Sequence, residues 1–203
     1  MTYDSKPWLK SYKLGPYKLE QSLAPYPEAP VYKALDDAAE KFAKKTAILF
    51  LGRELKYRDL KMQADCLASG LIGLGVVKGD KVGIFLPNCP ETIISDWGVL
   101  KTGAAVVPIS TLRTDDGIVH EAGSAKVKVI ICREEHLDRL WALKDRCGFE
   151  HLVVTPTQGY DISELSVPLP DGAVSFKMLL NNSTPLSTEV DINPKEDLCE
   201  LAF

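Results

Sequence analysis

Residues 81–110 read "KVGIFLPNCPETIISDWGVLKTGAAVVPIS", and this stretch decides the fold class. A short apolar run (81–88) predicts a buried strand. A helical pattern then begins at Pro90 and stops at Gly103, as expected from the preference for proline at the start of helices and glycine after their end. A second apolar run (104–110) predicts another strand. Two strands joined through a helix are expected to be parallel, because a tight turn can join only antiparallel strands.

The same alternation of strands and helices continues toward the carboxyl terminus. A helix is expected at 115–124, a strand at 127–132, a helix at 134–148 and a strand at 151–155. Four short apolar strands separated by three helices predict a parallel sheet covered on both faces. With right-handed crossovers, the expected fold is a doubly wound, mostly parallel α/β layer with flanking helices.

Upstream of this layer, the sequence predicts two helices and a hairpin. The stretch 31–45 has one apolar stripe and predicts a helix, and a second helix is expected at about 58–74. Between them, two β-rich runs flank Gly52 and Arg53, which indicates a hairpin turn.

The remaining segments complete the expected domain organisation. Residues 1–30 are rich in proline and tyrosine and are expected to form an extended leader. The α/β subdomain occupies 31–155. Residues 156–197 lose the regular pattern and predict an irregular excursion, with helical character only at 176–182. The last residues, 198–203, are apolar enough to form one more strand.

Composition limits the classes of function. The chain has 203 residues, 45% of them hydrophobic and 26% charged, as in an ordinary soluble globular protein. A net charge of −4 argues against a nucleic-acid partner, and "KKT" at 44–46 is read only as a helix end. No signal peptide and no apolar run of membrane-spanning length are apparent, and the five widely spaced cysteines are typical of reduced thiols. We therefore expect a cytoplasmic protein.

The glycine-rich stretch 73–81, "GLGVVKGDK", is not a phosphate-binding loop. After Gly73 and Gly75, a dinucleotide fingerprint requires glycine where Lys78 stands, and a Walker A loop requires a different spacing. The stretch also follows a helix and precedes a strand, whereas a phosphate cradle follows a strand and opens a helix. We interpret it as a helix stop and a turn.

The three histidines predict no metal centre. His120, His136 and His151 lack the spacing of metal ligands. Two of them, His120 and His136, fall on expected helices among charged neighbours, which indicates solvated surface side chains.

Three polar residues follow expected strands, where ligands of open α/β sheets often bind. Ser110 and Thr111 end one strand, although no base is placed near them by the sequence. Arg133 ends another and could meet a phosphate, or could form a surface ion pair with Glu134 or Glu135. From the residues alone, the chain provides a scaffold and no assembled catalytic or metal site.

Several stretches together resemble the adenylate-forming (AMP-binding) superfamily of acyl-CoA synthetases, adenylation domains and luciferases. Their order and spacing agree over about residues 31–155, and the leader is most similar to that of long-chain fatty-acid–CoA ligases. One stretch, "HEAGSAK", is less regular than the corresponding family helix end. The four stretches that carry the resemblance are "LKYRDL" (55–60), "GVVKGDKVGIFLPNCPE" (75–91), "LKTGAAVVPIS" (100–110) and "GSAKVKVIIC" (123–132).

The resemblance also implies that the chain is a fragment. In that family a stretch similar to "NPKEDLCELAF" (193–203) runs into a strand and then a loop that holds the ATP phosphates. Residues 31–203 would thus be the amino-terminal part of an AMP-binding domain that ends just before the phosphate loop. The whole enzyme would use Mg-ATP to convert a carboxylic acid into an acyl-adenylate and then into a CoA thioester, and the fragment alone would be inactive.

The resemblance places few functional residues in this chain. ATP, Mg²⁺ and CoA would be the cofactors of the whole enzyme and a fatty acid its substrate, with no catalytic residue or metal ligand here. Arg133 corresponds to a region where some relatives meet the CoA phosphates, while Gly103 and Pro108 would be architectural. Two alternatives stay open: a stand-alone interaction or dimerisation module, including a homodimer, and a ligase for an aryl or amino acid.

Overall fold

The computed structural model describes residues 13–14, 17–18, 24–157 and 165–203. Most of the expected leader therefore lies outside the described residues. Its described parts include the short antiparallel pair β1 (Lys13–Leu14) and β2 (Tyr17–Lys18).

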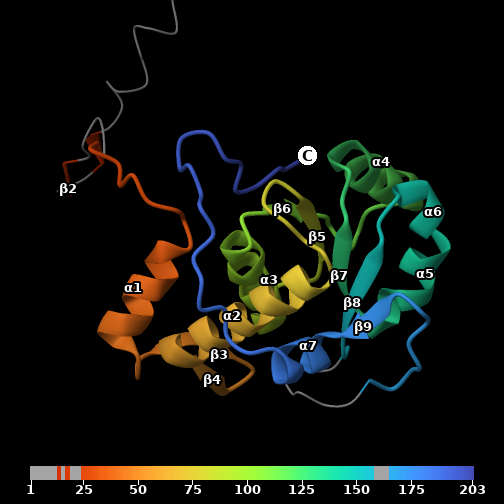
Figure 1. Cartoon of the computed structure of the whole chain (residues 1–203), viewed down its shortest axis with the longest axis horizontal. Coiled ribbons are helices and arrows are strands. Elements are labelled where there is room, and N and C mark those ends of the chain that lie inside the picture. Colours follow the sequence, from red (N-terminus) through yellow and green to blue (C-terminus); the bar gives the residue numbers. More distant parts are fainter. Residues whose placement is uncertain (1–12, 15–16, 19–23, 158–164) are drawn as a thin grey trace, which may run out of the picture.

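A five-stranded parallel sheet forms the centre of the molecule (Figure 1). The strand order is β6-β5-β7-β8-β9. Four of these strands coincide with the expected apolar runs, whereas β9 falls inside the segment expected to be irregular. The strands are β5 (Lys81–Phe85), β6 (Ala105–Pro108), β7 (Val129–Arg133), β8 (His151–Thr155) and β9 (Ala173–Ser175).

Helices cover both faces of the sheet, which confirms the predicted doubly wound α/β class (Figure 1). On one face, α2 (Tyr57–Gly73), α3 (Pro90–Lys101) and α7 (Phe176–Asn182) enclose a core with Leu67, Ile94 and Phe176. The opposite face carries a second core, built around residues such as Ile118, Leu140 and Leu152. Its helices are α4 (Asp115–Ala125), α5 (Leu137–Ala142) and α6 (Lys144–Cys147).

The amino-terminal elements pack beside α2. Helix α1 (Lys33–Phe42) contacts α2, and the hairpin of β3 (Thr46–Phe50) and β4 (Arg53–Lys56) connects the two helices. The predicted hairpin is confirmed, but its turn lies one residue earlier, at Leu51 and Gly52. Phe50 pairs with Arg53, so Arg53 already belongs to the second strand.

The glycine-rich stretch behaves as a helix stop and turn. Helix α2 ends at Gly73, and Gly75 has φ +85°, a left-handed conformation that glycine adopts at little cost. Asp80 stabilises the following turn, since its carboxylate accepts a hydrogen bond from Val77 N at 2.9 Å.

Three expected elements differ from the structure. The helix predicted at 134–148 is divided: Glu134–His136 is a 3₁₀ turn, and a tightened i→i+3 bond from Leu143 N to Leu140 O separates α5 from α6. The expected irregular segment 156–197 supplies β9, whose residues extend the sheet by pairing with β8. No continuous strand forms at 198–203.

At the carboxyl end of the described chain, Glu200 makes one parallel bridge with Val106 of β6. The hydrogen bonds are Val106 N to Cys199 O and Leu201 N to Val106 O, each 2.9 Å. This segment therefore begins to pair with the edge of the sheet without extending β6 into a regular ladder. None of the helices in the described parts of the chain is long and apolar enough to cross a membrane.

Candidate functional site

The connections of the sheet create a crevice at the carboxyl ends of β5 and β6. From β5 the chain passes through α3 on one face, whereas from β6 it passes through α4 on the other face. The two loops that follow these neighbouring strands therefore diverge. In open α/β sheets, ligands bind outside the carboxyl ends of the strands.

An open cavity of about 1000 Å³ lies between these two loops. Its apolar wall includes Ile84, Trp97 and Val106, and the segment that follows Leu198 closes one side. Polar side chains line the cavity from both loops, from α3 and α4, and from the carboxyl-terminal residues that follow Leu198. These polar lining residues are Asn88, Thr92, Asp96, Ser110, Thr111, Arg113, Glu121 and Glu200.

Asp96 is the most perturbed acid of the cavity. Burial, together with a smaller contribution from the negative charge of Glu200, raises the pKa of its carboxyl to about 6. Asp96 lies on α3, whereas Glu200 is held beside β6 by its bridge to Val106. Two carboxyl groups thus line this cavity from different segments and disfavour a bound anion between them.

One cation, Arg113, also lines the cavity, but it already has a partner. Its Nε lies 2.6 Å from Glu121 Oε1, and the Glu121 side chain is only 6% exposed. The Arg113 carbonyl accepts a hydrogen bond from Arg139 at 2.6 Å, which fixes the loop before α4. Thr114 then caps α4 by accepting a hydrogen bond from Gly117 N.

Ser110 and Thr111 lie at the cavity as the sequence predicted for residues that follow a strand. The hydroxyl of Ser110 accepts a hydrogen bond from Leu112 N at 3.3 Å, which is a loop-stabilising contact. His120 lies on α4 and is exposed, with its ring centroid 6.0 Å from that of Phe203.

Arg133 ends β7 at the same edge of the sheet. Its side chain is 18% exposed, and its Nη1 lies 3.9 Å from Glu135 Oε1, a long ion pair of the kind that the sequence left open. His136 is more enclosed than expected, because its ring packs edge-on against Phe85 at 5.0 Å. Burial lowers the pKa of His136, and Arg139 and Arg133 lower it further, whereas Glu135 opposes the change. A phosphate contact of Arg133 stays a prediction.

The charged side chains of this cavity do not favour a triphosphate. Asp96 and Glu200 would repel it, and the cation that lines the cavity, Arg113, is paired with Glu121. Within the described ranges, no group of three or more His, Cys, Asp or Glu residues could hold a metal ion. The glycine-rich turn at 73–81 lies at the opposite, amino-terminal edge of β5.

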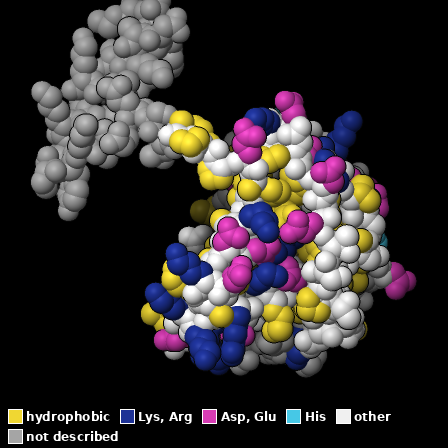
Figure 2. Space-filling view, turned by 60° about the vertical axis from the view of Figure 1, so that its left-hand side comes forward, with side chains coloured by type: hydrophobic (Ala, Val, Ile, Leu, Met, Phe, Trp, Pro, Cys, Tyr) yellow, Lys and Arg dark blue, Asp and Glu magenta, His cyan; other side chains and the backbone are white. Residues whose placement is uncertain are grey.

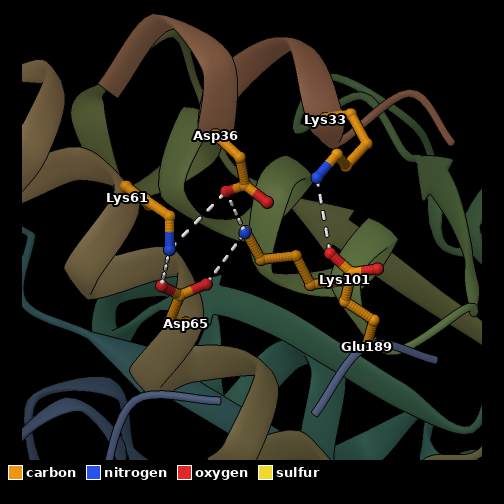
Figure 3. A network of polar contacts seen from close by, with 6 residues as sticks. All are labelled: Lys33, Asp36, Lys61, Asp65, Lys101 and Glu189. Atoms are coloured by element: carbon orange, nitrogen blue, oxygen red, sulfur yellow. Dashed lines mark hydrogen bonds and ion pairs between the residues drawn. The ribbon is translucent and has the colours of Figure 1, made fainter. Parts of the chain in front are cut away.

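A network of ion pairs joins α1, α2 and α3 (Figure 3). Lys101 of α3 contacts Asp36 of α1 and Asp65 of α2, the latter at 2.8 Å. Lys61 lies 2.6 Å from Asp65 and 3.7 Å from Asp36, so each carboxylate meets two ammonium groups. The Lys101 ammonium also lies 5.2 Å from the centre of the Tyr32 ring.

Sequence reasoning missed this network because its members come from three helices. Only the pair Lys61 and Asp65 has a recognisable i,i+4 spacing. Balanced charges and the junction of three helices indicate an architectural role rather than a ligand site.

The chain belongs to the AMP-binding enzyme family, whose pattern it matches over residues 35–199. It is 35% identical over 155 residues to a long-chain-fatty-acid–CoA ligase of Bacillus subtilis (strain 168), which covers 76% of this chain and 27% of the ligase.

Solved structures show the same fold. A long-chain-fatty-acid–CoA ligase, FadD1 of Archaeoglobus fulgidus, superimposes with a TM-score of 0.77 at 21% identity, covering 92% of this chain and 36% of that one. The anthranilate–CoA ligase AuaEII, solved in complex with anthranoyl-AMP, gives a TM-score of 0.75 at 25% identity, covering 87% and 32%. The chain thus spans about a third of the length of these ligases.

Proposed function

We propose that this chain is the amino-terminal part of an ATP-dependent acid–CoA ligase that acts on a long-chain fatty acid. The observation that carries the proposal is the 35% identity to a long-chain-fatty-acid–CoA ligase over 155 residues, which span most of the α/β layer. In the proposed reaction, the carboxylate attacks ATP to give an acyl-adenylate and pyrophosphate. The CoA thiol then displaces AMP to form the thioester.

In this proposal the chain supplies a rigid wall rather than the reacting groups. The α/β layer presents the loops after β5 and β6 at one edge, where the cavity of about 1000 Å³ opens. ATP, Mg²⁺ and CoA are cofactors of the whole enzyme. The acidic side chains of Asp96 and Glu200 support placing the triphosphate elsewhere, since they would repel it. The chain alone is therefore inactive.

Arg133 is the residue of this chain that we assign to the CoA phosphates. It lies at the carboxyl edge of the sheet with part of its side chain accessible, and its contact with Glu135 is long, at 3.9 Å. A guanidinium in this position can exchange a weak carboxylate partner for a two-pronged contact with phosphate.

Two other readings have specific support. The similarity to an anthranilate–CoA ligase, at 25% identity, favours an aromatic acid as the alternative substrate. The exposed apolar side chains of Leu112 and Phe203 at the cavity favour an interaction or homodimerisation module. We also propose a cytoplasmic location, supported by five cysteines that are all free thiols.

Acid-dependent ATP–pyrophosphate exchange tests the proposal. The native polypeptide, isolated from its source with an antibody to this chain, should exchange pyrophosphate in the presence of a C16 fatty acid. Exchange driven by anthranilate but not by the fatty acid would favour the aromatic substrate. Exchange with neither acid, nor with a panel of amino acids, would contradict the enzyme and favour the module.

A further inference from the structure

The turn of the β3–β4 hairpin carries a leucine where the backbone disfavours it. Leu51 has φ +48° and Gly52 has φ +79°, so both residues of this two-residue loop are left-handed. Such loops prefer Asn-Gly, because asparagine tolerates positive φ better than a bulky apolar residue does. The Leu51 residue is nevertheless 79% exposed, so packing in the fold does not explain its presence.

A second leucine is exposed next to the turn. Leu49 is 69% exposed, whereas its neighbours Ile48 and Phe50 pack against the core. The hairpin therefore has an inner face bound to the domain and a solvent-exposed tip, where Leu49 and Leu51 lie beside the charged side chains of Arg53 and Glu54. Exposed apolar side chains that cluster at one place mark interaction sites rather than ordinary surface.

Basic residues surround the base of this hairpin. The end of α1 contributes Lys41, and the turn that follows contributes Lys44 and Lys45. The second strand brings Lys56 beside them, since Lys56 pairs with Thr46. Two backbone hydrogen bonds fix this arrangement: Tyr57 N to Lys45 O at 3.1 Å, and Arg58 N to Ala43 O at 3.2 Å. The sequence predicted only that these lysines end a helix. It did not predict that the hairpin brings Lys56 close to them.

The charge of this region opposes that of the whole chain. Residues 40–59 hold six basic and three acidic side chains, a net charge of +3, whereas the whole chain has a net charge of −4. Figure 2 shows Lys and Arg side chains gathered together with apolar ones on the lower part of the face that includes α1. A basic surface with an apolar tip is complementary to an anionic surface that has an apolar interior.

We propose that the β3–β4 hairpin docks end-on to an anionic lipid bilayer. Leu49 and Leu51 enter the boundary between headgroups and acyl chains, to a depth of roughly 5–10 Å. Lys45 lies four residues behind Leu49, or about 13 Å along a strand. This places the basic residues near the lipid phosphates, where each lysine strengthens binding about fivefold.

Vesicle flotation tests the docking without reference to enzymatic activity. The chain is mixed with vesicles of phosphatidylcholine alone or with 30 mol% phosphatidylglycerol, at low salt and at about 0.5 M NaCl. We expect binding to the anionic vesicles only. Binding should be lost at high salt, because salt screens the attraction between the lysines and the lipid phosphates. Equal binding to neutral vesicles, or none to either, would overturn the proposal.

Matched variants locate the surface. Leu51→Asn removes the apolar tip while giving the loop its preferred Asn-Gly sequence, so the fold is retained and binding should fall at least fivefold. Leu112→Asn changes a leucine that is 93% exposed at the cavity, and its binding should equal that of the wild type. Lys44→Gln with Lys45→Gln should reduce binding about 25-fold at low salt.

The alternative is that the exposed hairpin tip binds a second copy of the chain. Sedimentation velocity without vesicles distinguishes the two. If Leu51→Asn abolishes a dimer of the wild type and leaves vesicle binding unchanged, the tip binds a second copy and the lipid proposal is wrong.

Discussion

The ammonium group of Lys101 lies 2.8 Å from a carboxylate oxygen of Asp65, and the two side chains are only 5% and 6% exposed (Figure 3). Asp36 completes the contact from α1, so one lysine on α3 binds carboxylates from the other two helices. A buried charge is tolerated only when it is paired, because its hydration is lost on folding. The three helices are therefore locked in one mutual arrangement.

Replacing this lysine should destabilise the fold strongly. Lys101→Met keeps most of the side-chain volume but leaves the carboxylates of Asp36 and Asp65 with Lys61 alone. We expect the free energy of unfolding in urea to fall by about 3–5 kcal/mol.

The control is Lys33→Met, which removes an exposed contact with Glu189 at 3.4 Å. Its unfolding curve should be indistinguishable from that of the wild type, since exposed ion pairs contribute little. Similar effects of the two variants would show that the contribution of these ion pairs to the free energy of unfolding does not depend on their burial.

Asp96 should make stability depend on pH. Its carboxyl has a folded-state pKa of about 6, above the ordinary value of 3.8, so the folded protein binds more protons than the unfolded chain between these values. Stability therefore falls as pH rises from about 4 to about 6 and stays at the lower level above this window. Asp96→Asn should remove this fall and be more stable than the wild type at pH 7 by on the order of 2 kcal/mol.

Glu200→Gln separates the two causes of the shift. Burial is the larger cause, so this variant should keep most of the pH dependence while lowering the Asp96 pKa slightly. The free energy of unfolding of both variants is measured in urea at pH 4, 5, 6 and 7. If it changes with pH in Asp96→Asn as in the wild type, another group causes the pH dependence.

Gly98 should tolerate no side chain. A Cβ at this position of α3 would lie 2.8 Å from Cδ2 and 3.0 Å from Cβ of Leu67 on α2. Gly98→Ala should therefore destabilise the protein by about 1–3 kcal/mol through overpacking. Gly73→Ala is the matched control: it lies at the end of α2 with nothing within 4 Å of the added Cβ, and it should be neutral or slightly stabilising. Equal changes in the melting temperatures of the two variants would contradict the close packing of Gly98 against Leu67.

The regular part of the fold could be predicted because its signals are local. Apolar runs gave β5, β6, β7 and β8, and Pro90 and Gly103 marked the ends of the helix between the first two. Strand β9 has only three residues and follows Pro168, Pro170 and Gly172 closely, so its own sequence has no strand pattern. It forms because β8 offers an unpaired edge.

The functional residues were less predictable because they depend on contacts between distant segments. Sequence position placed Ser110, Thr111 and Arg133 at the carboxyl edge, but gave no indication that Asp96 would be half-buried near Glu200. The lysines at 44–45 were likewise assigned to one helix end, since the hairpin that brings Lys56 to them is a tertiary feature.

The isolated 203-residue chain should show no acid-dependent ATP–pyrophosphate exchange. The physical reason is the charge of its cavity, where Asp96 and Glu200 oppose a triphosphate and Arg113 is held by Glu121. Exchange by the pure chain above a no-acid control would contradict its assignment as an inactive part of the enzyme.

The mass of the native polypeptide tests the central proposal most directly. The aligned region of 155 residues is only 27% of the Bacillus subtilis ligase, so a full ligase would be roughly three times the length of this chain. An antibody to the chain should detect a band in source cells at more than twice 22.3 kDa. A single band at 22.3 kDa would contradict the ligase and leave an interaction module built on the same fold.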